Sequence, residues 1–371
     1  MEPSPPPAAP RRHPPPGTES LTRESGGICR EDGVFLTARD QGSLWGPVSW
    51  EGERLLPAEY RFLGRFARNG LALARARSGL FGYIGLDGGW AVAPAFRNGA
   101  AFSLNGLAAA EVPEGFGFLD RDGRWAVGPV FFEARPFSAA SLAPARERGR
   151  GMCPLWGAVA EDGSWAVSPR FSELAFFYCG RGLAFARDPE TGLAGMATEA
   201  GEWILAPRYA ELGAFTGPDL APAKSQEGLW GAASAGGRWA VPPKFTGLRP
   251  FSAAAEVTGA RAPSGLWGLV DATGAWRVPP TFADVGGPFA GPFAEGALAP
   301  AREEGSCLWG FADPEGRWRI EPRFAAVYPF FPSGRTAACD PAGLWGFIDA
   351  RGGWICPPRF PAVACIPPHG Y

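Results

Sequence analysis

Short apolar runs recur along this chain, and a polar turn bounded by glycine joins them in pairs. Near the C-terminus, the run Leu344–Asp349 is followed by the turn Ala350–Gly352 and by a second run, Gly353–Cys356. Two apolar runs joined by a three-residue loop predict a β-hairpin whose loop glycine adopts the left-handed conformation. A third apolar run precedes the hairpins, at 70–74, 106–109, 182–186 and 297–301. The pattern therefore predicts a unit of three short strands.

Nine copies of this unit follow one another, every 35 to 42 residues. Each copy has an anchoring Gly, usually preceded by Trp, and then a Gly at plus six, a Trp at plus eight and a Pro at plus twelve. The residues that define the pattern include Trp45, Gly46, Trp156, Gly157, Trp230, Gly231, Trp267, Gly268, Trp276, Trp309, Gly310, Trp318, Trp345, Gly346 and Trp354. Because the same residue types recur in every copy, we interpret them as packing and turn residues rather than as reactive groups.

A few copies depart from the pattern. Phe81, Phe116 and Ala194 replace the Trp before the anchoring Gly, and Arg54 replaces the plus-eight Trp of the first copy. Trp50 has no aromatic counterpart in the other copies, so we interpret it as a candidate exposed contact.

The pattern predicts an all-β protein. No window of eleven residues has helical periodicity, and 53 Gly and 40 Pro would interrupt helices throughout. The plus-twelve Pro cannot donate a ladder hydrogen bond, so we expect it to end the second strand or to lie at a sheet edge.

We expect an array of about nine three-stranded repeats. We favour an open, curved solenoid, because the blades of ring-shaped propellers usually have four strands and the rings usually have no more than eight blades. A closed, propeller-like ring is the alternative, since a lone strand at 33–37 could pair with the last hairpin.

The chain divides into three regions. Residues 1–30 are rich in Pro and poor in large apolar residues, which predicts a disordered arm. Residues 31–362 form the repeat array, and residues 363–371 form a short C-terminal tail. The arm contains Pro5–Pro7 and Arg11–Pro16, which offer a docking segment to an SH3 or WW domain.

The repeats resemble those of the WG-repeat family. The segments Gly265–Phe282, Leu308–Phe324 and Gly343–Phe360 carry the Trp-Gly pair, the turn glycine and the ending in proline and an aromatic residue. The resemblance covers roughly residues 33–360. It implies a β-rich repeat array, an interaction-type module, and no shared catalytic residue.

Catalytic and metal-binding patterns are scarce in this sequence. The two histidines, His13 and His369, lie in the tails, so a histidine triad or acid–base pair inside the array is excluded. The seven cysteines include no CxxC motif, which disfavours zinc and a disulfide framework and favours buried free thiols. We therefore expect no cofactor, no metal and no enzymatic activity.

Aspartates recur at the end of the first hairpin strand. Asp120, Asp271, Asp313 and Asp349 share this position, and Asp122 follows within the turn at Asp120. Calcium needs six to eight oxygen ligands, and several copies have no carboxylate at this position. Aspartate before a tight turn commonly accepts hydrogen bonds from the turn amides, so we expect turn capping rather than calcium binding.

Charge and hydropathy limit the classes of partner. The formal net charge is −2, with signs interspersed, so we expect neither nucleic acid nor an anionic membrane as partner. The sequence has no long apolar run and no secretory leader pattern, which predicts a cytoplasmic location, with the nucleus as the alternative.

Two function classes follow from these patterns. The first is a non-enzymatic scaffold for protein–protein interaction, with an unidentified protein partner. The second is a carbohydrate- or small-ligand-binding array, or a glycosidase-like enzyme on a ring, which would need exposed aromatics and carboxylates converging on one face. We favour the first, because nearly every Trp recurs where a unit must pack against its neighbour.

Overall fold

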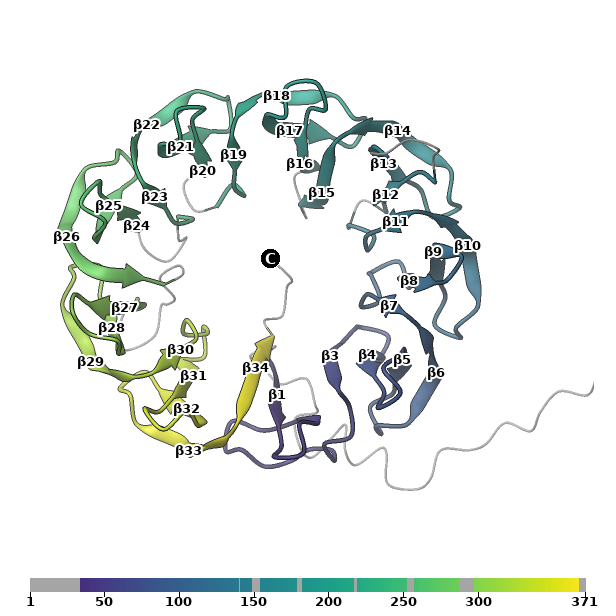
Figure 1. The fold of residues 1–371 in the computed structure, drawn as a ribbon, viewed down its shortest axis with the longest axis horizontal. Coiled ribbons are helices and arrows are strands. Elements are labelled where there is room, and N and C mark those ends of the chain that lie inside the picture. The colour runs from purple at the N-terminus through teal and green to yellow at the C-terminus, as the bar shows by residue number, and fades with distance from the viewer. Residues whose placement is uncertain are drawn as a thin grey trace, which may run out of the picture.

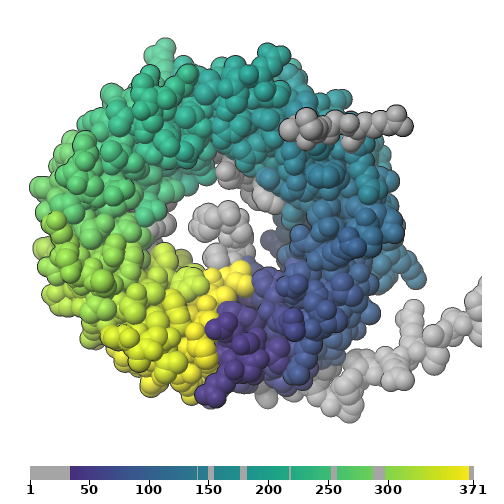
Figure 2. Space-filling view, viewed as in Figure 1, coloured from purple at the N-terminus to yellow at the C-terminus, as the bar shows by residue number. Residues whose placement is uncertain are grey.

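The chain folds into a ring of β-sheets around a central opening (Figures 1 and 2). The computed structural model describes residues 34–139, 141–148, 154–178, 182–216, 219–251, 257–286 and 297–366. In these residues the strands group into nine radial blades, numbered here in chain order. Both histidines, the Pro-rich arm and residues 367–371 lie outside the described ranges.

Within each blade the strands lie side by side, in order from the central opening to the outside of the ring (Figure 1). Blade 1 contains β34 (Ala362–Ile366), β1 (Phe35–Arg39) and β2 (Trp45–Pro47). Blade 2 contains β3 (Phe62–Phe66), β4 (Ala72–Arg75), β5 (Phe81–Ile84) and β6 (Trp90–Phe96). Blade 3 contains β7 (Asn98–Gly99), β8 (Ala108–Val112), β9 (Gly115–Leu119) and β10 (Trp125–Phe131). Blade 4 contains β11 (Glu133–Ala134), β12 (Ala143–Arg146), β13 (Trp156–Val159) and β14 (Trp165–Phe171).

The remaining blades repeat this order. Blade 5 contains β15 (Glu173–Tyr178), β16 (Leu183–Arg187), β17 (Ala194–Thr198) and β18 (Trp203–Tyr209). Blade 6 contains β19 (Glu211–Leu212), β20 (Leu220–Lys224), β21 (Trp230–Ser234) and β22 (Trp239–Phe245). Blade 7 contains β23 (Gly247–Leu248), β24 (Val257–Arg261), β25 (Trp267–Asp271) and β26 (Trp276–Val285). Blade 8 contains β27 (Ala299–Glu303), β28 (Trp309–Ala312) and β29 (Trp318–Phe324), and the end of β26 pairs with β27. Blade 9 contains β30 (Ala326–Val327), β31 (Arg335–Cys339), β32 (Trp345–Asp349) and β33 (Trp354–Phe360).

The all-β prediction is confirmed, and among the described residues no helix is long and apolar enough to cross a membrane. The predicted hairpin is present between two strands in blades 2 to 9, whereas in the first copy a single bridge between Val48 and Arg54 flanks the turn. All nine plus-six glycines have φ between 77° and 82°. At Gly274 a second reason adds to the positive φ: a Cβ at this position would lie 2.4 Å from Cγ1 of Val241 in the preceding blade. Glycine at plus six therefore serves both the turn and the contact between blades.

The predicted three strands per repeat are one too few. An aromatic residue, such as Phe96, Phe171, Tyr209 or Phe360, lies two residues after the plus-twelve Pro and is here called the plus-fourteen aromatic. Most blades have a fourth, innermost strand that follows it, and in β11 this strand is only two residues long. So short a strand has no alternation that a sequence could display, and its pairing with β12 defines it. In blades 2 to 9 the outermost strand contains the plus-twelve proline, as in Trp354–Phe360. Except for β26, whose end pairs with β27, these strands lie at an edge of their sheet, where the missing N–H costs no ladder bond.

The ring is closed by strands from the two ends of the described chain. β1 pairs antiparallel with β34 over five residues, from Phe35 opposite Ile366 to Arg39 opposite Ala362. The open solenoid that we favoured is therefore wrong, and the alternative ring is correct. Residues 363–366, which we expected in a tail, belong to the closing strand. Pairing satisfies two strand edges that an open array would leave exposed.

The hydrophobic core is divided among the contacts between neighbouring blades. One cluster joins Val241 and Phe245 of blade 6 to Leu248 and Val270 of blade 7. The cluster at the closing blade contains Trp50, which is 0% exposed, and its ring centroid lies 5.3 Å from that of Phe347. The expectation that Trp50 is an exposed contact is therefore wrong, because closure buries it between the first and last copies.

Candidate functional site

The boundary between adjacent blades, here called a seam, has the same aromatic pair around most of the ring. Each plus-eight Trp meets the plus-fourteen aromatic of the preceding blade edge to face, with ring centroids 5.2 to 6.1 Å apart. The pairs are Tyr60 with Trp90, Phe96 with Trp125, Phe131 with Trp165, Phe171 with Trp203, Tyr209 with Trp239, Phe245 with Trp276, Phe282 with Trp318 and Phe324 with Trp354. These Trp side chains keep one edge in solvent, and Trp276 and Trp354 are each 37% exposed.

The closing seam uses a cation instead of an indole. The guanidinium of Arg54 lies 5.7 Å from the centroid of the Phe360 ring, and its Nη1 donates to the carbonyl oxygen of Ala38 at 2.8 Å. Burial lowers the pKa of Arg54. The one departure from Trp at plus eight thus falls at the junction where the two ends of the array meet.

A second set of residues marks the outside of the seams. At plus thirteen, five copies have an exposed basic residue whose charged group lies 5.0 to 5.5 Å from the centroid of the next aromatic ring in the chain. These rim cations are Arg170, Arg208, Lys244, Arg323 and Arg359. Arg323 and Arg359 also donate to the carbonyl oxygens of the plus-six glycines of the next blade, Gly352 and Gly52.

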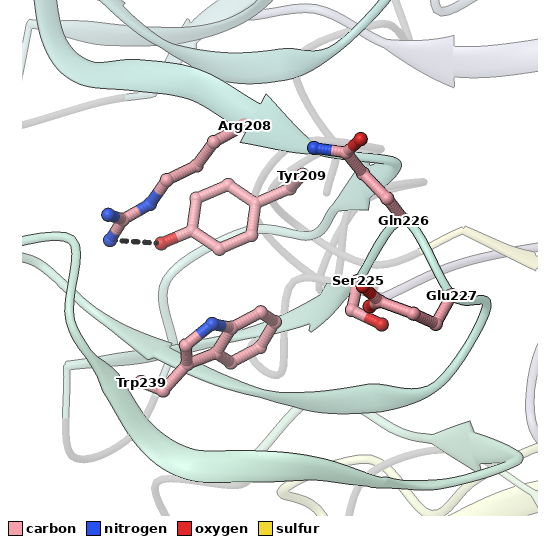
Figure 3. A pocket seen from close by; sticks show the side chains of 6 residues that line it. All are labelled: Arg208, Tyr209, Ser225, Gln226, Glu227 and Trp239. Carbon is pink, nitrogen blue, oxygen red and sulfur yellow. Dashed lines mark hydrogen bonds between the residues drawn. The ribbon is translucent and has the colours of Figure 1, made fainter.

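The seam between blades 5 and 6 contains a cavity of about 270 Å³ (Figure 3). It is lined by Arg208, Tyr209, Ser225, Gln226, Glu227 and Trp239. The guanidinium of Arg208 donates to the Tyr209 hydroxyl at 3.1 Å, and this hydroxyl donates to the carbonyl oxygen of Gly237 at 3.0 Å. Figure 3 shows Arg208 and Glu227 on opposite sides of the cavity, with Gln226 above and Trp239 below.

The charges in this cavity are mixed. The Ser225 hydroxyl lies beside the carboxylate of Glu227 and holds its pKa below the usual range, so Glu227 is ionised at neutral pH. Glu227 is the one carboxylate among the six lining residues. The cavity can therefore bind a polar group through Arg208 and present Glu227 to a donor, with an aromatic surface between them.

The Trp residues before the anchoring glycines lie elsewhere in each blade. Trp156 is buried beneath Arg135 and Arg146, whose guanidinium groups lie 4.3 and 5.1 Å from its ring centroid. Trp230, Trp267 and Trp309 lie under Lys224, Arg249 and Arg302, whereas Trp345 contacts Tyr328 and Trp45 packs against the core of blades 1 and 2. These tryptophans support the fold.

The anchoring glycines make room for the outer strand of their own blade. A Cβ at Gly157 or Gly231 would lie 2.3 Å from a carbonyl oxygen of that strand, and at Gly268, Gly310 and Gly346 2.4 to 2.5 Å from one. In blade 1, a Cβ at Gly46 would lie 2.9 Å from the carbonyl oxygen of Pro57, which follows the turn. In four copies, at Trp156, Trp230, Trp267 and Trp309, the Trp-Gly pair thus brings two strands close together beneath a cation.

Turn capping by aspartate is confirmed. The Oδ1 of Asp120 accepts hydrogen bonds from the N–H groups of Asp122 and Arg124, both at 2.9 Å. Asp271 accepts from Thr273 and Ala275, and Asp313 and Asp349 repeat the arrangement.

The expectation of buried thiols holds for three cysteines and fails for a fourth. Cys339, Cys356 and Cys365 are buried, whereas Cys307 is exposed in the turn before β28. Cys29, Cys153 and Cys179 lie outside the described residues.

Sequence reasoning missed the rim cations, although a signal was present. A basic residue precedes the plus-fourteen aromatic in five of nine copies, at a position to which we assigned no role from the sequence. Which face of the strand it occupies became evident only from the ring.

Comparison with known proteins supports the repeat assignment. Residues 116–150, 195–230, 267–307 and 309–339 match the family model described as "WG containing repeat". No curated protein matches the chain by sequence.

Two solved structures are similar to the chain at low sequence identity, and the first shares its fold. The chain is similar to one described as "Crystal structure of the eukaryotic initiation factor", with TM-score 0.59 and 10% identity over 90% of this chain and 98% of that one. A second is BamB from Moraxella catarrhalis, with TM-score 0.42 and 12% identity over 78% of this chain and 94% of that one. The repeats matched within residues 116–339 are therefore WG-containing repeats, at the spacing seen in the ring.

Proposed function

We propose that this protein is a non-enzymatic scaffold that binds a protein partner on the outside of its ring, in the cytoplasm. The observation that carries the proposal is the composition of the seams. Each of several seams presents a partly exposed Trp, a second aromatic ring and a basic side chain within one contact cluster. Trp, Tyr and Arg are the residues most enriched in the energetic centres of protein interfaces.

The ring also favours binding by holding these side chains in place. The aromatic of one blade is fixed against the Trp of the next, and the cation lies over the same aromatic. Side chains that are already ordered lose little conformational entropy when a partner binds, so more of the contact energy appears as affinity.

The carbohydrate alternative receives less support from the cavity. Hydrolysis of a glycosidic bond commonly uses two carboxylates that flank the bond. The cavity between blades 5 and 6 offers Glu227 opposite Arg208, an arrangement that suits a polar contact with a polypeptide better than a pair of acids.

The proposal can be tested by site-specific photo-crosslinking in cells. A photoreactive amino acid is placed in the full chain at Ala206 or Ala240, both exposed in outer strands, and, as a control, at Ser264, exposed in the β24–β25 turn. We expect Ala206 and Ala240 to capture the same protein and Ser264 not to capture it. The captured protein is then purified, and calorimetry should show direct binding that Arg208→Ala weakens. Equal labelling at Ser264, or no direct binding by the purified protein, would refute the proposal.

A further inference from the structure

The outer strands of blades 4, 5 and 6 share one charge distribution. β14, β18 and β22 contain one charged residue each, the rim cations Arg170, Arg208 and Lys244, and no carboxylate. The other exposed positions are small or apolar, and the side chain of Ile204 is 58% exposed. The outside of these three blades is therefore an apolar surface with a positive charge at the same position in each blade.

The same three blades neutralise their inner cations. Each blade pairs a basic residue at the end of its second strand with a glutamate at the start of its innermost strand. The N–O distances are 3.4 Å for Arg146 and Glu133, 3.3 Å for Arg187 and Glu173, and 2.8 Å for Lys224 and Glu211. Within the described residues, none of the three rim cations lies within 4.0 Å of a carboxylate oxygen. The inner cations are therefore paired with glutamates within their own blade. Among the described residues, the rim cations have no carboxylate partner and can bind one from outside.

Each rim cation is also held in position. The charged groups of Arg170, Arg208 and Lys244 lie 5.5, 5.2 and 5.2 Å from the centroids of the neighbouring aromatic rings, and each of these rings packs against the Trp of the next blade. A cation on an aromatic face is oriented while remaining open to an anion on its solvent side. The three cations thus form a preordered row.

We infer that the rim of blades 4 to 6 binds an extended, acidic segment of a polypeptide, in which carboxylates alternate with apolar residues. The inference rests on the proposed function and specifies its partner. Carboxylates would meet Arg170, Arg208 and Lys244, and apolar side chains would cover Ile204 and its neighbours. In the cavity between blades 5 and 6, the side chains of Gln226 and Glu227 would form hydrogen bonds with the backbone of the segment.

A polypeptide suits this surface better than a nucleic acid does. Nucleic acids bind through many closely spaced phosphate contacts and an attractive long-range field. This protein has a formal net charge of −2, and its row has one cation per blade with apolar surface between. Such spacing matches separated carboxylates and apolar side chains.

The experiment measures binding of the full-length protein to a fluorescein-labelled peptide, five repeats of Glu-Gly-Leu, by fluorescence anisotropy. The comparison probes are five repeats of Lys-Gly-Leu and an oligothymidylate of equal negative charge. We expect the acidic peptide to bind with an affinity that falls as salt rises, and neither comparison probe to match it.

Two variants locate the site. R208E/K244E should weaken binding of the acidic peptide roughly tenfold or more. The control R121E/R124E changes the net charge equally at exposed arginines of blade 3 and should leave binding unchanged. Because the long side chains cover aromatic rings, R208M/K244M tests the charge while keeping an unbranched apolar stem, and it should also lose binding without a change in melting temperature.

Three outcomes would overturn the inference. They are equal loss in R208E/K244E and R121E/R124E, full binding by R208M/K244M, and oligothymidylate binding as tight as that of the peptide. A protein captured at Ala206 and Ala240 that binds R208M/K244M undiminished would retain the proposed function while rejecting the acidic segment.

Discussion

Replacing Trp50 should destabilise the ring more than replacing a tryptophan of the repeat pattern. Trp50 is 0% exposed and contacts both Phe347 and Phe331 of blade 9. Complete burial of a Trp removes up to roughly 250 Å² from water. At about 25 cal/mol per Å² this contributes about 6 kcal/mol, an upper bound that a compact unfolded state lowers to about 4 to 5 kcal/mol.

Trp276 provides the matched comparison, because it is also a tryptophan beside a phenylalanine but is 37% exposed. Scaling the same area by the buried fraction gives about 2.5 to 3 kcal/mol for Trp276→Ala. Urea denaturation of the two alanine variants measures the free energy of unfolding, and small-angle scattering shows whether Trp50→Ala opens the ring. A smaller loss for Trp50→Ala than for Trp276→Ala would refute the reasoning that closure buries Trp50.

Three further predictions concern the turns and the thiols. Gly274→Ala should cost about 2 kcal/mol or more in the free energy of unfolding, because φ is +78° and the new methyl would meet the preceding blade; thermal melts check this, and an unchanged melt would contradict it. The pKa of Asp271 is lowered, chiefly by the hydrogen bond from the Thr273 hydroxyl. The ionised carboxylate therefore stabilises the fold above about pH 4, and this stabilisation is lost as the pH falls through the pKa of Asp271 in the folded state. Thr273→Val should raise the pKa of Asp271 in an NMR titration, and an unmoved pKa would reject the hydroxyl as its cause. In the native protein, iodoacetamide should modify the exposed Cys307 well before Cys365, because burial raises the pKa of the Cys365 thiol. Peptide mass spectrometry measures the order of modification, and earlier modification of Cys365 would contradict the prediction.

Much of the local structure could be read from the sequence. The recurring Gly at plus six predicts the left-handed turn, and each of the nine has a positive φ. Asp120 before such a turn predicts the capping hydrogen bonds that the structure contains. These features depend only on interactions among residues within a few positions of one another, so a short stretch of sequence is enough to predict them.

The candidate site was harder to predict because it is assembled from two blades. Arg208 and Tyr209 belong to one repeat, and Glu227 and Trp239 belong to the next. Their residue types are visible in the sequence, but their convergence depends on the angle at which consecutive blades pack. The same limitation led to Trp50 being placed on the surface, since its neighbours lie near the opposite end of the chain.

The sequence by itself determined the repeat, three of the four strands in most blades, and the turns, because these follow from periodicity and from the conformational needs of glycine and proline. Only the tertiary structure decided that the array closes. The pairing of Phe35–Arg39 with Ala362–Ile366 joins segments more than 300 residues apart, and an open array would have the same local pattern. Closure depends on the summed rotation between nine blades, a quantity that no single repeat encodes, and it also decides that Trp50 is buried at the junction.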